Sequence, residues 1–276
     1  MPNESVLRDS AARSLTAKRS LNENVPEPCI CLQGFVHKQN KMVKDDLKVK
    51  ARICCVLALF LLLCCASAAT AAGESAIKAP AGMAPLPLTL PKPMFVGTPQ
   101  NIKGVKQLEK PLGKPRPPFF APKGVKNLAL GKKISGSDEE PIMGELKMIT
   151  DGDREAADGS YVELGPFTQQ ITIDLETEHD IYALLFWHYH KQARVYFDVI
   201  AQVSNDPEFK KFTTVYNNDH DNSAEQGVGK DNHYVETSEG RLLDTKGVRG
   251  RYVRLYSGGN NASDLNHYIE VEVYGK

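Results

Sequence analysis

The sequence predicts an all-β protein whose C-terminal domain, residues 124–276, is an antiparallel β-sandwich of the jelly-roll type. Apolar and polar residues alternate in several short runs, as they do in strands with one buried face. Clusters of Gly, Asn and Asp separate these runs, and no amphipathic helical pattern longer than two turns interrupts them. Closely spaced strands over about 150 residues are typical of a sandwich or a jelly roll.

Four runs of residues carry the strand prediction. The alternation in residues 171–175, 195–203 and 269–273 predicts strands that are buried on one face only. Residues 181–187 are apolar on both faces, which predicts a strand in the middle of the sheet or one that loops cover.

The N-terminal part of the chain indicates export. Residues 1–52 form a leader with net charge +4, and residues 53–72 combine 13 consecutive apolar residues with an alanine-rich exit. This order is typical of a secretory signal peptide, and 13 apolar residues are too few to cross a hydrocarbon layer of about 30 Å. We therefore expect a secreted or cell-surface protein, cleaved after Ala68 or Ala71.

Two alternatives to this simple export remain open. All six cysteines lie at or before residue 65, so a cleaved chain has no disulfide and no thiolate metal site. A lipid on Cys64 or Cys65, or a retained apolar segment, would instead make the membrane a partner. Met42 would begin a more ordinary signal peptide, so residues 1–41 are an unusually long leader or an upstream mis-start.

Residues 73–123 predict an extended linker. Eleven of the chain's 17 prolines lie between Pro80 and Pro122, and such a stretch forms neither a helix nor a central strand. We expect a stalk that holds the domain away from a surface, although Phe95, Phe119 and Phe120 hint at contacts with the domain. The linker carries net charge +6 and the domain −10, and an acidic domain excludes nucleic acid as its partner.

Six motifs in fixed order make the domain resemble the coagulation-factor type C, or discoidin-like, family. They are NLALGK (127–132), ITDGD (149–153), ITIDL (171–175), VIAQVSND (199–206), RYVRLY (251–256) and IEVEVYG (269–275). The resemblance implies an eight-stranded galactose-binding-like jelly roll, a group that includes the family 32 carbohydrate-binding modules. The usual Trp before the ITIDL strand and the paired cysteines of vertebrate members are absent.

Clustered carboxylates suggest a calcium site near the start of the domain. Asp151, Asp153 and Asp158 lie on a glycine-bearing loop and offer the hard oxygen ligands that Ca²⁺ prefers, although Asp-Gly pairs are also common in plain turns. The resemblance favours calcium, because related domains hold a structural ion with this loop, its backbone carbonyls and a glutamate that matches Glu270.

Histidines raise a zinc alternative. His188 and His190 lie two apart at the end of a predicted strand and so share a face, with His220, Asp221, His233 or His267 as further ligands. No HEXXH helix, Gly-x-Ser-x-Gly elbow or phosphate-binding glycine loop is present. We therefore expect no enzyme, and a metal-dependent hydrolase ranks last.

Carbohydrate recognition fits the remaining side chains. Aromatic faces stack on sugar rings while imidazole, guanidinium and amide groups bond to hydroxyls, and the resemblance implies such a set on loops at one end of the sandwich. The candidate ligand-binding residues are Trp187, His188, His190, Arg194, Asn260, Asn261, Asn266 and His267. Packing is an equal alternative for Trp187. The sequence thus predicts an exported, non-catalytic carbohydrate-binding module with a structural calcium, and a cell-surface adhesion module for a protein or cell-envelope component is the alternative.

Overall fold

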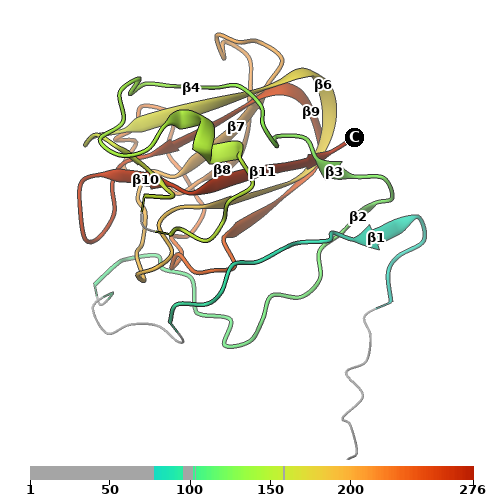
Figure 1. Ribbon diagram of the computed structural model, residues 1–276, viewed down its shortest axis with the longest axis horizontal. Helices are drawn as coiled ribbons and strands as arrows, with labels where there is room; N and C mark the ends of the chain where they lie inside the picture. The colour runs from blue at the N-terminus through green and yellow to red at the C-terminus, as the bar shows by residue number, and fades with distance from the viewer. Residues whose placement is uncertain (1–77, 96–101, 103, 158) are drawn as a thin grey trace, which may run out of the picture. The chain divides into compact units, whose positions relative to one another are not determined.

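A computed structural model describes residues 78–95, 102, 104–157 and 159–276 (Figure 1). The chain divides into two compact units, and every described residue belongs to the second, Ser75–Lys276. The predicted leader, the signal segment and Asp158 lie outside the described residues. Within these ranges no helix has the length and apolar character that a membrane span requires.

Antiparallel strands make up nearly all of the regular secondary structure in the described part of the chain. The main sheet has seven strands in the order β3-β11-β6-β9-β7-β8, with β4 also paired to β6. Two further pairs, β1 with β2 and β5 with β10, flank it. The strands are β1 (Met83–Pro85), β2 (Phe120–Pro122), β3 (Lys126–Asn127), β4 (Ile134–Gly136), β5 (Val162–Leu164), β6 (Gln169–Trp187), β7 (Ile200–Ser204), β8 (Thr213–Asn217), β9 (Arg241–Ser257), β10 (Asn266–Tyr268) and β11 (Glu270–Gly275), and a 3-10 turn, η2, spans Leu146–Thr150.

Two long strands run through both layers of a sandwich. The first half of β6 pairs with β4 and with the second half of β9, and the second half of β6 pairs with β11 and with the first half of β9. The register breaks between Asp174 and His179, where Glu176 adopts a positive φ of 74°. The domain is therefore the all-β sandwich that the sequence predicts.

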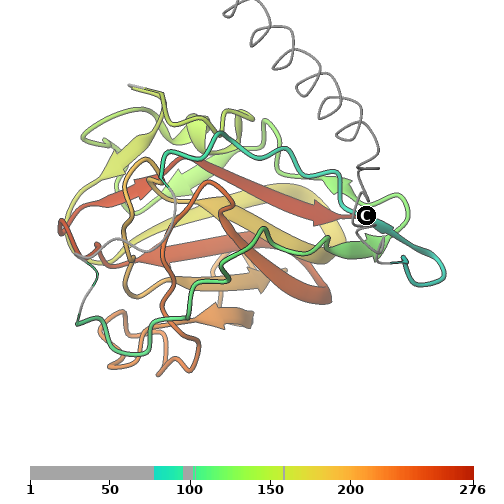
Figure 2. The ribbon, with the colours of Figure 1, turned by 90° about the horizontal axis from the view of Figure 1, so that it is seen from below.

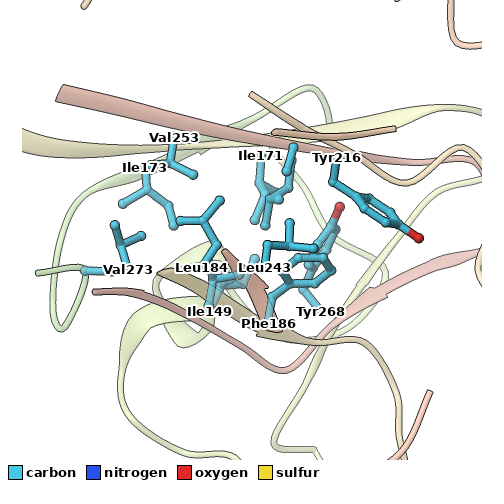
Figure 3. Close-up of a cluster of buried hydrophobic side chains, with 14 of the residues drawn as sticks. Ile149, Ile171, Ile173, Leu184, Phe186, Tyr216, Leu243, Val253, Tyr268 and Val273 are labelled. Atoms are coloured by element: carbon cyan, nitrogen blue, oxygen red, sulfur yellow. The ribbon is translucent and has the colours of Figure 1, made fainter. Parts of the chain in front are cut away.

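The core lies between these two layers. Ile171 and Ile173 from the first half of β6 belong to the same buried cluster as Leu184 and Phe186 from its second half. Figure 3 shows the two sets pointing toward each other, with Val273 of β11 on the lower side. The predicted alternation of residues 171–175 is confirmed, because Ile171, Ile173 and Leu175 are buried and the residues between them are half-buried.

The second half of β6 is buried on both faces, as the sequence predicts. Leu184 and Phe186 face the main core, whereas Ala183, Leu185 and Trp187 form a second apolar cluster on the opposite face. Residues of the proline-rich segment cover this second cluster, namely Leu86, Leu88 and Phe119, together with Val125, Tyr161, Tyr189 and Leu242.

The stalk prediction for residues 73–123 is therefore corrected for the described part of this segment. Its two described stretches run across the sheet (Figure 2), and β1 pairs with β2. The segment is extended, as its prolines require, but it packs on the apolar face of β6 instead of standing free. The compact unit accordingly begins near Ser75 and not at residue 124.

Two of the predicted strands differ from the structure. In the run 195–203 only β7, from Ile200 onward, is a strand, because Asp198 adopts a positive φ of 51° and ends the extended geometry. In the last run both faces are buried, so Glu270 and Glu272 have no exposed surface. The expectation of one solvent-exposed face fails there because the loop that carries Arg154 covers these carboxylates.

We expect Gly240→Ala to destabilise the domain strongly. Gly240 has φ of +61°, and a Cβ there would lie 2.7 Å from the Trp187 ring. The left-handed backbone costs an alanine about 1–2 kcal/mol, and overpacking adds about 1–3 kcal/mol. Gly131→Ala is the matched control, since its φ is +69° but no atom lies within 4 Å of the added Cβ. Urea unfolding measures both, and equal losses of stability would contradict the packing role.

Candidate functional site

One end of the sandwich gathers five polar and aromatic side chains from three segments. Tyr161 directly precedes β5 and Glu163 lies within it, Tyr189 and Arg194 come from the loop after β6, and His267 comes from β10. We call these five residues the Tyr189 cluster. All except His267 are partly exposed, so the cluster reaches the surface.

The aromatic rings of the cluster are in contact with one another and with a cation. The Arg194 guanidinium lies 4.7 Å from the centre of the Tyr189 ring, a cation–π distance. The Tyr161 and Tyr189 rings meet edge to face at 5.1 Å, and Tyr161 also packs 6.1 Å from the His267 ring. These contacts hold an aromatic surface beside a planar hydrogen-bond donor.

His267 joins the charged members of the cluster. Its Nε2 lies 3.1 Å from Glu163 Oε2 and 3.3 Å from Arg194 Nη1. Burial, with the nearby Arg194 adding to it, lowers the pKa of His267 to about 3. The imidazole is therefore neutral at pH 7, and its Nε2 either donates to the Glu163 carboxylate or accepts from Arg194, according to the tautomer.

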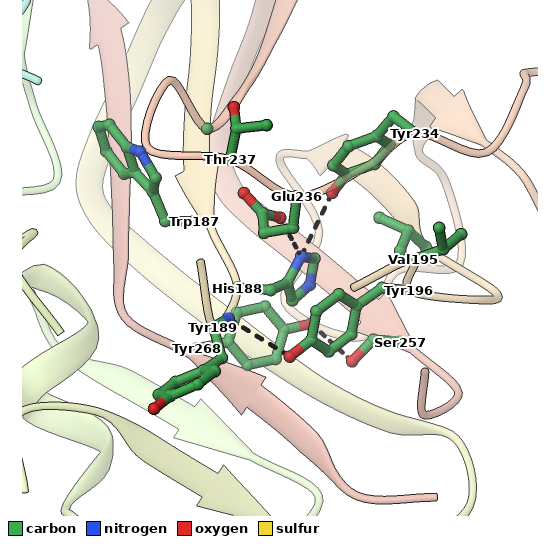
Figure 4. A network of polar contacts seen from close by, with 12 residues as sticks. Trp187, His188, Tyr189, Val195, Tyr196, Tyr234, Glu236, Thr237, Ser257 and Tyr268 are labelled. Atoms are coloured by element: carbon green, nitrogen blue, oxygen red, sulfur yellow. Dashed lines mark hydrogen bonds and ion pairs between the residues drawn. The ribbon is translucent and has the colours of Figure 1, made fainter. Parts of the chain in front are cut away.

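A buried polar network supports this loop end from below (Figure 4). His188 Nδ1 lies 3.2 Å from both Glu236 Oε2 and the Tyr234 hydroxyl, and its ring stacks on Tyr196 at 4.2 Å. The Tyr189 backbone N–H donates to the Tyr196 hydroxyl at 3.3 Å. The network therefore fixes the backbone on which the Tyr189 side chain stands.

Further hydrogen bonds fix the loop at Arg194. The Arg194 carbonyl accepts from the Glu236 N–H at 2.8 Å. The N–H of the next residue, Val195, donates to the Asn261 side chain at 2.8 Å. Asn266 holds the neighbouring loop in the same way, because its amide donates to the carbonyls of Gly165 and Phe167.

Several residues predicted to bind ligand are structural instead. Trp187 and His188 have no exposed surface, and the Trp187 indole N–H donates to the Ser238 carbonyl at 3.0 Å. His190 is 1% exposed and bonds to the Arg154 carbonyl at 2.7 Å. Because a fully buried ring touches no ligand, Trp187 and His188 are corrected to packing and supporting residues.

The remaining predicted residues divide between the cluster and its supports. Arg194 and His267 belong to the Tyr189 cluster, whereas Asn260 and Asn266 are buried and Asn261 caps the Val195 backbone. Sequence reasoning missed Tyr161 and Glu163. Their alternation with the buried Val162 and Leu164 was the available signal, since it puts both side chains on the outer face of one short strand.

The same end of the domain presents one strained aromatic residue. Phe167 is 84% exposed and has φ of +66°, an unusual backbone conformation for a bulky side chain. It lies on the loop between β5 and β6 that Asn266 fixes through two hydrogen bonds. The fold therefore holds an apolar ring in solvent close in sequence to Glu163.

The loop predicted to bind calcium packs against the last strand. The Gly152 N–H donates to Glu270 Oε2 at 3.1 Å, while Glu270 Oε1 is buried without a hydrogen-bond partner. Burial, with the neighbouring Glu272 adding to it, raises the pKa of Glu270 to about 9. Nearby, Arg154 pairs with Glu272, and Asp153 accepts a hydrogen bond from the Ser160 hydroxyl. An unpartnered carboxylate oxygen beneath this loop fits a hard cation.

No zinc group forms from the predicted histidines in the described part of the chain. The set of three side chains close enough there to share an ion is Asp198, Asp219 and Asp221, which includes no histidine. Asp219 uses both of its oxygens on the Ser223 and Ala224 N–H groups. The Asp219 carboxylate is thus already engaged in hydrogen bonds within its own loop.

Comparisons with known proteins find low similarity to several solved structures. No protein-family model and no curated protein matches the chain. A family 89 glycoside hydrolase from Clostridium perfringens is 20% identical with a TM-score of 0.41, covering 54% of this chain but 14% of its own length. The CBM32 of AlyQ, solved with 4,5-unsaturated mannuronic acid, is 17% identical with a TM-score of 0.39, covering 51% of this chain and 92% of its own. A Streptococcus pneumoniae fucose binding module is 18% identical with a TM-score of 0.38, covering 54% and 97%.

The domain is an antiparallel β-sandwich. Its two layers share the strands β6 and β9, and the Tyr189 cluster lies on the β5–β10 pair and the loop after β6. The antiparallel β-sandwich that the sequence predicts is therefore confirmed. The two candidate sites lie outside the core: the Tyr189 cluster and the loop that carries Asp151.

We expect Asp198→Asn to make the domain more stable at pH 7. Burial, with Asp219 and Asp221 nearby, raises the pKa of Asp198 to about 6, whereas an unfolded Asp has about 3.9. The folded state therefore binds this proton more tightly, and the wild type loses stability as pH rises from about 4 to about 6. Asparagine does not titrate and tolerates the positive φ of this position.

Thermal unfolding between pH 4 and pH 7 measures this difference, which should vanish toward pH 4. Asp206→Asn is a control of opposite sign, because backbone hydrogen bonds lower the pKa of Asp206 and its charge stabilises the fold. A pH-independent effect of Asp198→Asn would contradict the buried charge.

Proposed function

We propose that this domain is a non-catalytic carbohydrate-binding module that binds sugar at the Tyr189 cluster. The observation that carries the proposal is the half-buried Arg194 guanidinium, held over the Tyr189 ring and beside His267 and Glu163. A planar donor next to an aromatic face suits a pyranose ring, which offers hydroxyl pairs at its edge and C–H groups on its face.

The arrangement also gives each member a role. Arg194 donates to hydroxyl oxygens, the Glu163 carboxylate accepts from hydroxyl groups, and the rings of Tyr189 and Tyr161 carry the apolar face of the sugar. His267 lies beside both Arg194 and Glu163 and bonds to one of them at a time through Nε2. The buried network under the loop reduces the entropy lost on binding, because Tyr189 and Arg194 are already held in place.

A structural calcium ion completes the proposal. The unpartnered Glu270 Oε1 and the nearby Asp151 carboxylate are the oxygen donors that would hold it. The ion would supply positive charge to acidic groups that the fold buries, and it would tie the loop to β11. Its role is mechanical and involves no reaction step.

Export and surface location remain part of the proposal through the predicted signal segment 53–72. The alternative function is a cell-surface adhesion module that binds a protein or cell-envelope component. The exposed, strained Phe167 supports this alternative, because a protruding apolar ring offers a contact to a protein surface.

We expect Arg194→Ala to weaken glycan binding about 10- to 100-fold. Hydrogen bonds to a charged group contribute about 1.5–3 kcal/mol. Binding on a glycan array, followed by calorimetry with the selected sugar, measures the change. Arg249→Ala is the matched control, since Arg249 is exposed and pairs only with Glu178 and Asp180. Binding to cell envelopes that free sugars fail to inhibit would instead support the adhesion module.

We expect calcium to raise the melting temperature of the wild type relative to excess chelator. At a calcium concentration of about 100 Kd, the ion adds about 2.7 kcal/mol to the free energy of unfolding. Glu270→Gln should abolish this response, while Glu139→Gln, an exposed substitution in the loop before η2, should keep it. Scanning calorimetry makes the comparison, and a wild type insensitive to chelator would remove calcium from the proposal.

A further inference from the structure

A stretch of the proline-rich segment is bound to the domain in the way that a peptide ligand is bound. We call residues 104–118 the strap. Leu108 forms a parallel bridge with His233, in which the Glu109 N–H donates to the His233 carbonyl at 2.8 Å and the His233 N–H to the Gln107 carbonyl at 3.0 Å. A single isolated bridge thus ties the strap to the loop between β8 and β9. Parallel backbone pairing of this kind is also used in peptide recognition.

A carboxylate on the strap meets a prepared cation on the domain. The two Glu109 oxygens accept from Arg241 Nη1 and Nη2 at 2.9 and 2.8 Å. The Arg241 guanidinium lies 4.7 Å from the Tyr216 ring centre and 4.8 Å from that of Tyr234. Since both rings belong to the domain, the domain itself orients this fork for a carboxylate.

A guanidinium on the strap meets carbonyls and a carboxylate on the domain. Arg116 donates through Nη1 to the Gly240 carbonyl at 3.0 Å and through Nη2 to the Glu239 carbonyl at 2.8 Å. Its backbone N–H also donates to the Glu239 carboxylate, at 3.2 and 3.3 Å from the two oxygens. The two contacts therefore have opposite polarity. In one an anion of the strap meets a cation of the domain, and in the other a cation of the strap lies beside an anion of the domain.

Between these two anchors the strap is exposed to solvent. Residues 110–115 make up this exposed stretch, which contains Pro111, Pro115 and two lysines. The strap is basic whereas residues 124–276 carry net charge −10, so long-range attraction assists the docking. The segment bound here is thus an extended, proline-rich, basic chain with a carboxylate and a guanidinium seven residues apart.

We propose that the surface formed by Tyr216, His233, Tyr234, Glu239 and Arg241 is a peptide-binding groove, which the protein's own strap occupies. Its partner is an extended, proline-rich, basic segment of another chain with the same Glu and Arg spacing. Covalent attachment gives the strap a high effective concentration, so the groove accepts a second segment only when the strap has left. This function is separate from the sugar site and does not depend on it.

The test uses the full chain with Glu109→Ala and Arg116→Ala, which releases the strap and leaves the groove unchanged. A fluorescent synthetic peptide of residues 104–118 is the probe, and anisotropy measures its binding. We expect it to bind the released variant at least about tenfold more tightly than the wild type. Lys106→Ala with Lys114→Ala is the matched control, because both lysines are exposed and the strap should stay bound.

Arg241→Lys in the released variant should reduce peptide binding about tenfold, because lysine keeps the charge but loses the fork. Trp187, the chain's single tryptophan, is buried against Gly240 and reports through its emission that each variant is folded. Sugar binding should be unchanged in the Arg241→Lys variant. A peptide that fails to bind the folded released variant, or binds no better than a scrambled peptide, would show that the strap is only a fixed part of the fold.

Discussion

The second half of β6 must be covered on both faces, and most of the architecture follows from this constraint. One face packs against the other layer of the sandwich through Leu184 and Phe186. The other face, with Leu185 and Trp187, would expose a large apolar surface to water. The proline-rich segment lies on it, which explains why a sequence unable to form helix or central strand belongs to the compact unit.

A similar requirement organises the loop end. The buried polar side chains His188, Glu236 and Tyr234 meet through His188 Nδ1. His188 Nε2 and Glu236 Oε1 remain buried without a hydrogen-bond partner. Their contacts fix the loop that carries Tyr189 and Arg194. Some residues that look like ligand contacts in the sequence are therefore buried, and they hold the exposed residues in place. The buried and the exposed residues alternate along the same short loop.

The sequence predicts the fold better than the site because strand alternation is local and the site is not. Residues 171–175 and 181–187 carry their burial pattern in their own order. The break at Asp198 depends on a positive φ, and the burial of Glu272 depends on Arg154, a counter-charge 118 residues away. Arg194 and His267 were recognised by residue type, whereas Glu163 meets them only through the pairing of β5 with β10.

The sharing of β6 and β9 between both layers has a consequence for how the domain folds. Paired residues of these strands lie between 55 and 88 positions apart in the chain, and no hairpin turn brings them together. Neither layer can assemble before this distant pairing exists, which implies slow formation and a single cooperative transition. A fragment that ends before β9 would lack a partner along most of β6, so half of this jelly roll has no stable existence of its own.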